Sequence, residues 1–88
     1  MVLRIERLVG ENDIVVFRMS GRIDTEHVDT LRELLKQEDG KVAIDLREVT
    51  LINREAVRFL ALSEADGVEL RNCADYIGEW LARERRGK

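Results

Sequence analysis

Residues 41–60 read KVAIDLREVTLINREAVRFL, and this stretch decides the fold. Apolar residues alternate with polar or small ones over 42–46, which is the period of a half-buried β-strand. A short polar turn follows and leads to an amphipathic helix that begins near Asn53. The stretch therefore predicts a strand, a turn and a helix, with the strand at 42–46 and the helix at 53–65.

The rest of the chain predicts three further strands and two further helices. Glycine tolerates a left-handed backbone, so we expect Gly40 and Gly67 to end the first and second helices. The turn residues Gly-Glu-Asn-Asp at 10–13 join the first two strands into an antiparallel hairpin. The remaining predicted elements are strands near 3–6, 14–20 and 68–71, a helix from Asp24 or Thr25 to Gly40, and a helix over 74–84.

This order, β-β-α-β-α-β-α, predicts an α/β fold with a mixed four-stranded sheet. Helical crossovers join parallel strands with a right-handed connection, so both crossover helices fall on the same face if the sheet order follows the chain from the second strand to the fourth. Three strands alternate in hydropathy, as expected for a sheet with one solvated face. Residues 14–17 are apolar on both sides, which indicates a central strand. We expect the helices mainly on one face of the sheet.

Length and charge predict a single domain over residues 1–88 without an affinity for polyanions. The chain has 15 Lys and Arg against 18 Asp and Glu, a formal charge of −3. Nucleic-acid binding would need a basic face. The only basic run, at about 83–88, is typical of a solubilising tail after a helix and can be flexible.

Cysteine count and hydropathy predict a cytoplasmic protein that is not inserted in a membrane. Cys73 is the only cysteine, so no internal disulfide can form, and a reducing compartment is the simple interpretation. Residues 1–9 alternate in hydropathy and lack the apolar core of a signal peptide. The longest apolar runs are far shorter than the ~20 residues of a membrane span.

No constellation of residues predicts catalysis, a cofactor or a metal. The chain has no Gly-x-Ser-x-Gly elbow and no glycine-rich phosphate loop. One histidine and one cysteine do not make a zinc site without further ligands. We therefore interpret His27 as a half-buried residue at the edge of the core and Cys73 as a small packing residue. The apolar residues of the last helix, Tyr76, Ile77, Trp80 and Leu81, are interpreted as the face that docks this helix.

The helix at 53–65 carries one apolar residue outside its buried stripe. Leu62 lies opposite that stripe, close in angle to Glu55 and Arg58. It is either a single exposed leucine, which is common, or the centre of a contact surface with a polar rim. The candidate partner-binding residues are Asn53, Arg54, Glu55, Arg58 and Leu62.

Four segments, taken in order, resemble the STAS family, the sulfate-transporter and anti-sigma-factor-antagonist domain. Residues 17–24, FRMSGRID, are similar to the strand of that family that ends in Ser-Gly-x-Leu/Ile-Asp. Residues 42–46, with 49–52 after them, are similar to the stretch that leads to its switch site. Residues 67–72 and 76–81 are similar to its last strand and closing helix. The resemblance covers nearly the whole chain and implies the same β-β-α-β-α-β-α architecture.

The resemblance also locates a missing switch. Family members usually read Asp-Ser-Ser-Gly at the helix start, and the first serine is phosphorylated to release a partner. Here the same four places hold Asn53, Arg54, Glu55 and Ala56. Arginine cannot accept phosphate, so no phosphorylation is expected at the family position. Thr50 is a nearby hydroxyl that we assign mainly to the turn.

The resemblance implies a non-catalytic protein-interaction module of bacterial regulation. The partner would be an anti-sigma factor or kinase-like regulator, or a larger assembly. One alternative is a STAS-type accessory subunit of a lipid-transport ABC complex. Another is a weak nucleotide or small-ligand binder, because the helix start at Asn53 could receive an anion. The sequence leaves the oligomeric state open.

Overall fold

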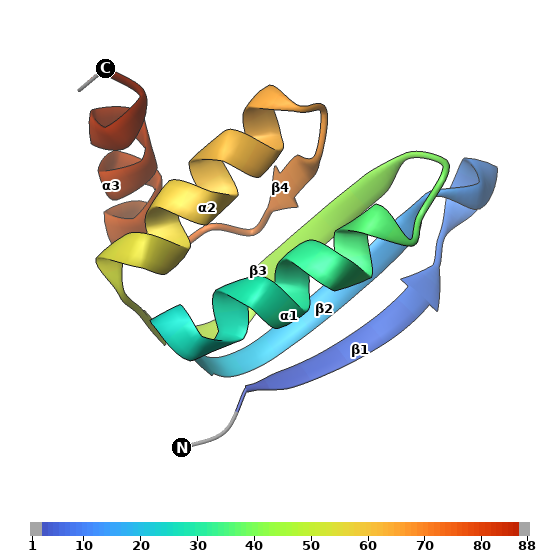
Figure 1. Ribbon diagram of the computed structural model, residues 1–88, viewed down its shortest axis with the longest axis horizontal. Helices are drawn as coiled ribbons and strands as arrows, with labels where there is room; N and C mark the ends of the chain where they lie inside the picture. Colours follow the sequence, from blue (N-terminus) through green and yellow to red (C-terminus); the bar gives the residue numbers. More distant parts are fainter. Residues whose placement is uncertain (1–2, 87–88) are drawn as a thin grey trace.

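The computed structural model describes residues 3–86 and has the predicted order of strands and helices (Figure 1). A short 3-10 turn at Glu11–Asp13 closes the first hairpin, where the predicted turn lies. The elements are β1 (Arg4–Val9), β2 (Val15–Ile23), α1 (Thr25–Lys36), β3 (Val42–Ile52), α2 (Arg54–Ala65), β4 (Glu69–Arg71) and α3 (Asp75–Arg86).

The four strands form one mixed sheet in the order β1-β2-β3-β4. β1 is antiparallel to β2, whereas β2, β3 and β4 run parallel. α1 and α2 lie side by side on one face of this sheet, and α3 packs beside α2 (Figure 1). The fold class is confirmed, including the central place of β2 and the helices on one face. β3 and β4 are each reached by a helical crossover from the neighbouring parallel strand, and crossovers of the same hand place both helices on one face.

The core lies between the helices and the strand residues that face them. Phe17 lies opposite Ile44 in the sheet, and Ile44 lies opposite Leu70, so these three share that face. Phe17 and Ile44 are almost fully buried. α3 contributes Ile77 and Leu81 to the same core. The burial of one continuous apolar cluster is the main stabilising contribution in so small a chain.

The opposite face of the sheet is polar over most of its length and apolar at one end, where Leu8, Val16 and Ala43 are successive partners in the register. One charged residue from each strand forms a row of alternating sign, because Glu6, Arg18, Asp45 and Arg71 are successive partners in the register. The Arg18 Nη1 lies 3.6 Å from the Glu6 Oε1. This row accounts for the alternating hydropathy of the strands, since a sheet with helices on both faces would have buried these positions.

β3 is longer than predicted, and the predicted turn between 46 and 53 is wrong. The strand continues to Ile52 and stays paired with β2 through two register shifts, one on each side of Ser20 and Gly21. Gly21 has a φ of 97°, a conformation that glycine adopts readily at such an irregularity. The polar residues Arg47 and Glu48 are exposed on a strand and do not turn the chain.

The ends of the helices agree only in part with the prediction. α2 is followed by Gly67 at φ 104°, as expected for a glycine that terminates a helix. Gly40 does not end α1, because that helix stops at Lys36 with Gln37 as its C-cap. α3 continues through Arg86, so most of the predicted basic tail at 83–88 is helical. Residues 87 and 88 of that tail lie outside the described residues.

Candidate functional site

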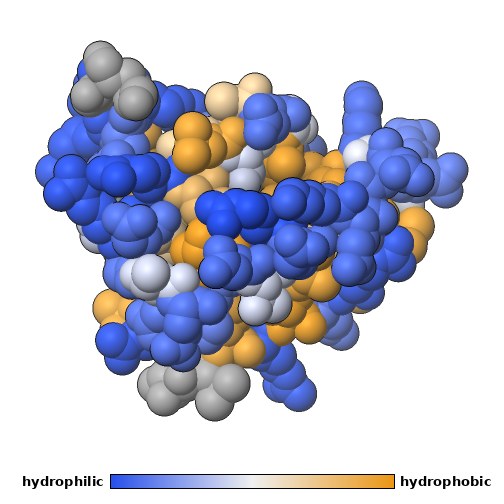
Figure 2. Space-filling view, in the orientation of Figure 1, coloured by the Kyte–Doolittle hydropathy of each residue, from blue (hydrophilic) through white to orange (hydrophobic). Residues whose placement is uncertain are grey.

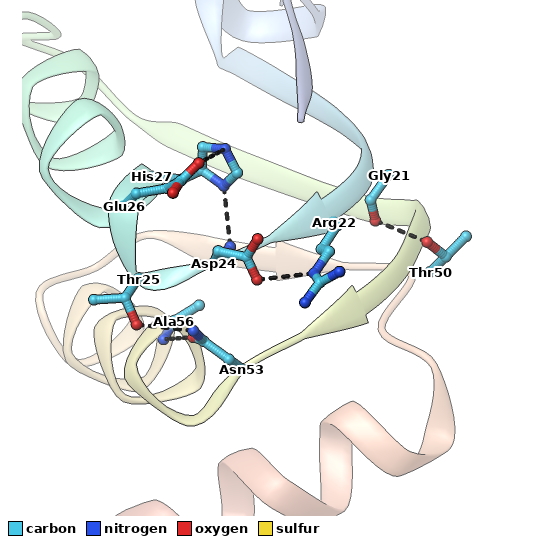
Figure 3. A network of polar contacts seen from close by, with 9 residues as sticks. All are labelled: Gly21, Arg22, Asp24, Thr25, Glu26, His27, Thr50, Asn53 and Ala56. Atoms are coloured by element: carbon cyan, nitrogen blue, oxygen red, sulfur yellow. Dashed lines mark hydrogen bonds and ion pairs between the residues drawn. The ribbon is translucent and has the colours of Figure 1, made fainter. Parts of the chain in front are cut away.

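The start of α2 is fixed by Asn53. Its Oδ1 accepts a hydrogen bond from the Ala56 backbone N–H at 2.9 Å, which satisfies one of the free donors at the helix start. Its Nδ2 donates to the Thr25 Oγ1 at 2.8 Å, so the same side chain joins the starts of α1 and α2 (Figure 3). The predicted cap is confirmed, and it holds the two helices in place.

α1 begins with a related arrangement built on Asp24 and His27. The Asp24 backbone N–H donates to the His27 Nδ1 at 3.0 Å, and the Arg22 Nε donates to the Asp24 carboxylate at 3.0 Å (Figure 3). His27 is half-buried, as predicted, and it also caps the helix, which the sequence analysis did not foresee.

Arg54, the first residue of α2, is paired with the end of α3. The Arg54 Nε lies 3.6 Å from the Glu84 Oε2, and the Arg58 Nε lies 3.6 Å from the Glu84 Oε1. The Glu84 side chain is only 17% exposed, whereas the two guanidinium groups are largely solvated. One carboxylate is thus shared by two arginines of α2. Glu84 was missed by the sequence analysis.

α2 and α3 border a groove with an apolar floor and a charged rim. The floor is formed by Ala61, Leu62, Ala65 and Trp80. The rim contains Arg54, Arg58, Arg83, Glu84 and Arg85. The Leu62 side chain is 60% exposed, so it stays accessible to solvent. Figure 2 shows hydrophobic surface over α2 that is bordered by hydrophilic surface on the side of α3.

The five candidate partner-binding residues do not all reach this groove. Arg54, Arg58 and Leu62 line it. Asn53 is engaged in the cap, and Glu55 points its carboxylate to Arg58, at 3.8 Å from the Arg58 Nη1. Trp80 and the charged end of α3 are additional lining residues. No local pattern places Glu84 in the site, because its position depends on the packing of α3 against α2.

The apolar face of α3 divides into a docked part and an exposed part. Ile77 and Leu81 are buried against the domain, as predicted, and Trp80 is half-buried. Tyr76 does not dock in the core, because it is 47% exposed and its hydroxyl donates to the Thr50 backbone oxygen at 3.0 Å. The Thr50 hydroxyl itself donates to the Gly21 carbonyl of β2 at 3.1 Å. The assignment of Thr50 to a turn is wrong, because this residue lies in β3.

Cys73 packs against the core, as predicted for a small apolar residue. Burial raises the pKa of its thiol, and the negative charge of Glu64 adds to this effect. The thiol form is therefore favoured over the reactive thiolate. Among residues 3–86, no cluster of histidine, cysteine and acidic side chains has the arrangement of a metal site. No helix in the same range is long and apolar enough to cross a membrane.

No protein-family model matches this sequence, and no curated protein matches it. Among solved structures, the fold is similar to the antisigma-factor antagonist STAS domain from Rhodobacter sphaeroides. The TM-score is 0.59 and the sequence identity is 13%, and the match covers 83% of this chain and 92% of that chain. At this identity the likeness concerns the fold.

Proposed function

We propose that this chain, which has the fold of a STAS domain, is a non-catalytic protein-binding module of bacterial regulation. It would act in the cytoplasm in the manner of an anti-sigma-factor antagonist, through the start and exposed face of α2. The likeness to a solved antagonist domain supports the general role. The STAS fold is typically used for binding rather than for catalysis.

The observation that carries the proposal is the chemistry at the start of α2. The helix cap at Asn53 is intact, and the next residue, in the place that the resemblance gives to the phosphorylated serine, is Arg54. A guanidinium offers no hydroxyl for a phosphate and instead contributes a permanent positive charge. We infer that binding through this surface does not depend on phosphorylation of this chain.

The exposed Leu62 supports a binding role for the same helix. Covering an apolar side chain that is exposed to water lowers the free energy, so burial of Leu62 by a partner would favour binding. Arg54 and Arg58 lie on the same groove and can pair with charges of the partner. This combination of an apolar centre and a charged rim is typical of transient protein interfaces.

Two groups that could have supported phosphorylation or nucleotide binding are already hydrogen-bonded within the protein. The Thr50 hydroxyl is hydrogen-bonded to the Gly21 carbonyl, which argues against its use as a replacement phosphorylation site. The Ala56 N–H at the helix start is bound to Asn53, and Glu55 adds negative charge beside it. Both reduce the capacity of this helix start for a nucleotide phosphate.

The test is capture of the native partner by tagged protein, with the bound protein identified by mass spectrometry. We would compare wild type with Leu62→Asp, which places a charge in the centre of the surface. The matched control is Val9→Asp, because Val9 is 61% exposed at the end of β1 and away from α2. The expected result is one regulatory protein that wild type and Val9→Asp retain and Leu62→Asp loses.

The identity of the retained protein distinguishes the alternatives. An anti-sigma factor or a kinase-like regulator supports the proposal, whereas the ATPase of a membrane transporter points to an accessory subunit. Equal retention by Leu62→Asp would refute the assigned surface. Arg54→Ser, which places a serine at this position, should change the affinity for that partner, because it removes a charge from the rim of the contact. A phosphate on the natural chain that releases the partner would contradict the loss of switching.

A further inference from the structure

The groove between α2 and α3 has a charge opposite to that of the whole protein. Four arginines and one glutamate give its rim a formal charge of +3, whereas the chain carries −3. We propose that this groove binds an acidic amphipathic helix of a protein partner. The inference rests on the proposed function and names the chemistry of the segment that is recognised.

Two of the rim arginines have unused capacity for carboxylates. Arg83 makes no ion pair within residues 3–86. Arg54 contacts Glu84 only at 3.6 Å, which is beyond the distance of a good hydrogen bond. A guanidinium presents five N–H donors in a planar fork that matches a carboxylate. Arg54 and Arg83 can therefore each receive an acidic side chain from a partner.

The other two rim arginines are more fully engaged within the protein, Arg85 by one short ion pair and Arg58 by two longer ones at 3.6 and 3.8 Å. Arg85 Nη1 lies 2.8 Å from the Glu64 Oε1, and Arg58 is shared between Glu55 and Glu84. These pairs bring the carboxylates of Glu55 and Glu64 against the rim, so its net charge falls from +3 to +1 but stays opposite in sign to that of the whole chain. The partner's acidic residues would consequently be selected by Arg54 and Arg83.

The floor of the groove supplies the apolar half of the recognition. Leu62 is exposed between Ala61 and Ala65, and the half-buried Trp80 faces them from α3. Small alanine side chains leave room above the helix backbone, and a large apolar residue from a partner can fill that room against Leu62 and Trp80. A helix with one apolar stripe suits such a groove, and acids that flank the stripe would meet the arginine rim.

Trp80 also provides the measurement, because it is the only tryptophan in the chain. The probe is a synthetic helical peptide of about 18 residues, five turns, with leucines along one stripe, glutamates beside them and no aromatic residue. The comparison peptide has lysine in place of every glutamate. We expect a saturable change in Trp80 fluorescence with the glutamate peptide, weaker at high salt, and none with the lysine peptide.

The decisive variant is Arg83→Glu, and the matched control is Arg4→Glu. Both reverse one exposed charge, but Arg4 lies on β1, at the polar face of the sheet. Turning an attraction into a repulsion should weaken the binding of the glutamate peptide roughly tenfold for Arg83→Glu and leave it unchanged for Arg4→Glu. Arg83→Gln, which is the milder change, should give an intermediate loss.

Equal binding of the two peptides, or wild-type binding by both Arg83 variants, would refute the inference. Capture of the native partner separates this failure from that of the proposed function. One outcome is that Leu62→Asp loses the native partner, Arg83→Glu retains it, and the glutamate peptide does not bind. In that case the proposed binding surface on α2 is supported, and the proposal of an acidic helical ligand is refuted. If the peptide binds in an Arg83-dependent way but no regulatory protein is retained, the groove chemistry stands and the regulatory role is wrong.

Discussion

Arg54 lies at the first position of α2 and Glu84 near the end of α3, and the Arg54 Nε and the Glu84 Oε2 are 3.6 Å apart. This pair joins two helices that are distant in the sequence. It also places the first residue of α2 in contact with the last helix. The groove and its charge depend on this arrangement.

Replacing Glu84 by glutamine should loosen the junction of α2 and α3. The carboxylate is largely shielded from water and serves both Arg54 and Arg58, so its removal leaves two arginines close together without an anion between them. We expect a loss of about 1 kcal/mol in the free energy of unfolding, measured by urea denaturation. Glu79→Gln is the control, since Glu79 lies on the exposed side of the same helix. Equal effects of the two changes would contradict a role for the shared pair.

Removing the helix cap at Asn53 should lower the free energy of unfolding by more than the replacement of Glu84 does. Asn53→Ala loses both the bond to the Ala56 N–H and the bond to Thr25 that links α1 with α2. The expected loss is about 1–2 kcal/mol in the free energy of unfolding. Asn53→Asp keeps an acceptor for Ala56 and can accept from the Thr25 hydroxyl, so it should stay near wild type. A stable Asn53→Ala protein would show that the cap contributes little.

Asp45 should make the free energy of unfolding depend on pH in the acidic range. Its partial burial alone would raise its pKa, but hydrogen bonds from the Arg47 N–H and the Asn72 amide, together with the charge of Arg18, hold the pKa below its usual value. A carboxyl with a lowered folded pKa stabilises the protein above its unfolded pKa of about 4, and this contribution is lost as the pH falls through the folded value.

The measurement is urea denaturation of wild type and Asp45→Asn at neutral pH and at several values below pH 5. Wild type should lose more stability on acidification than Asp45→Asn, because only wild type has this carboxylate to protonate. Parallel curves for the two proteins would mean that Asp45 does not contribute.

Two glycines with free space around them should respond in opposite directions to alanine. A Cβ at Gly67 or at Gly78 would meet no atom within 4 Å. Gly67 has a φ of 104°, which an alanine adopts only with strain, so Gly67→Ala should lower the free energy of unfolding by about 1–2 kcal/mol. Gly78 lies inside α3, so Gly78→Ala should raise it by about 0.5–1 kcal/mol. Thermal unfolding of both variants checks the signs.

The fold could be predicted because its elements depend on local patterns. The alternation over 42–46 and the cap at Asn53 each define a structure within a few residues. The extension of β3 could not be predicted in this way, since residues 47–52 are held as a strand by pairing with the irregular end of β2. The early end of α1 before Gly40 likewise had no clear local signal.

The sequence predicted only those residues of the candidate site that lie on α2. Leu62 and Arg58 follow from the angular positions along α2, and both lie where that reasoning places them. Glu84 and Trp80 enter the site because α3 packs across α2, and helix packing is a relationship between distant segments. His27 as a cap was missed because histidine seldom replaces the glutamate or glutamine that is usual at that position.

The parallel pairing of β2 with β3 has a consequence for the order of events in folding. These strands can pair only after the segment between them, which contains α1, has brought their ends together. This loop closure lowers the chain entropy before the strand contacts can offset the loss. α3 is the last element and depends on α2 for its docking surface. We therefore expect Trp80 to reach its native environment late, after the sheet has formed, in stopped-flow refolding. The surface assigned to the partner would then be completed only in the final step, and an incompletely folded chain would lack it.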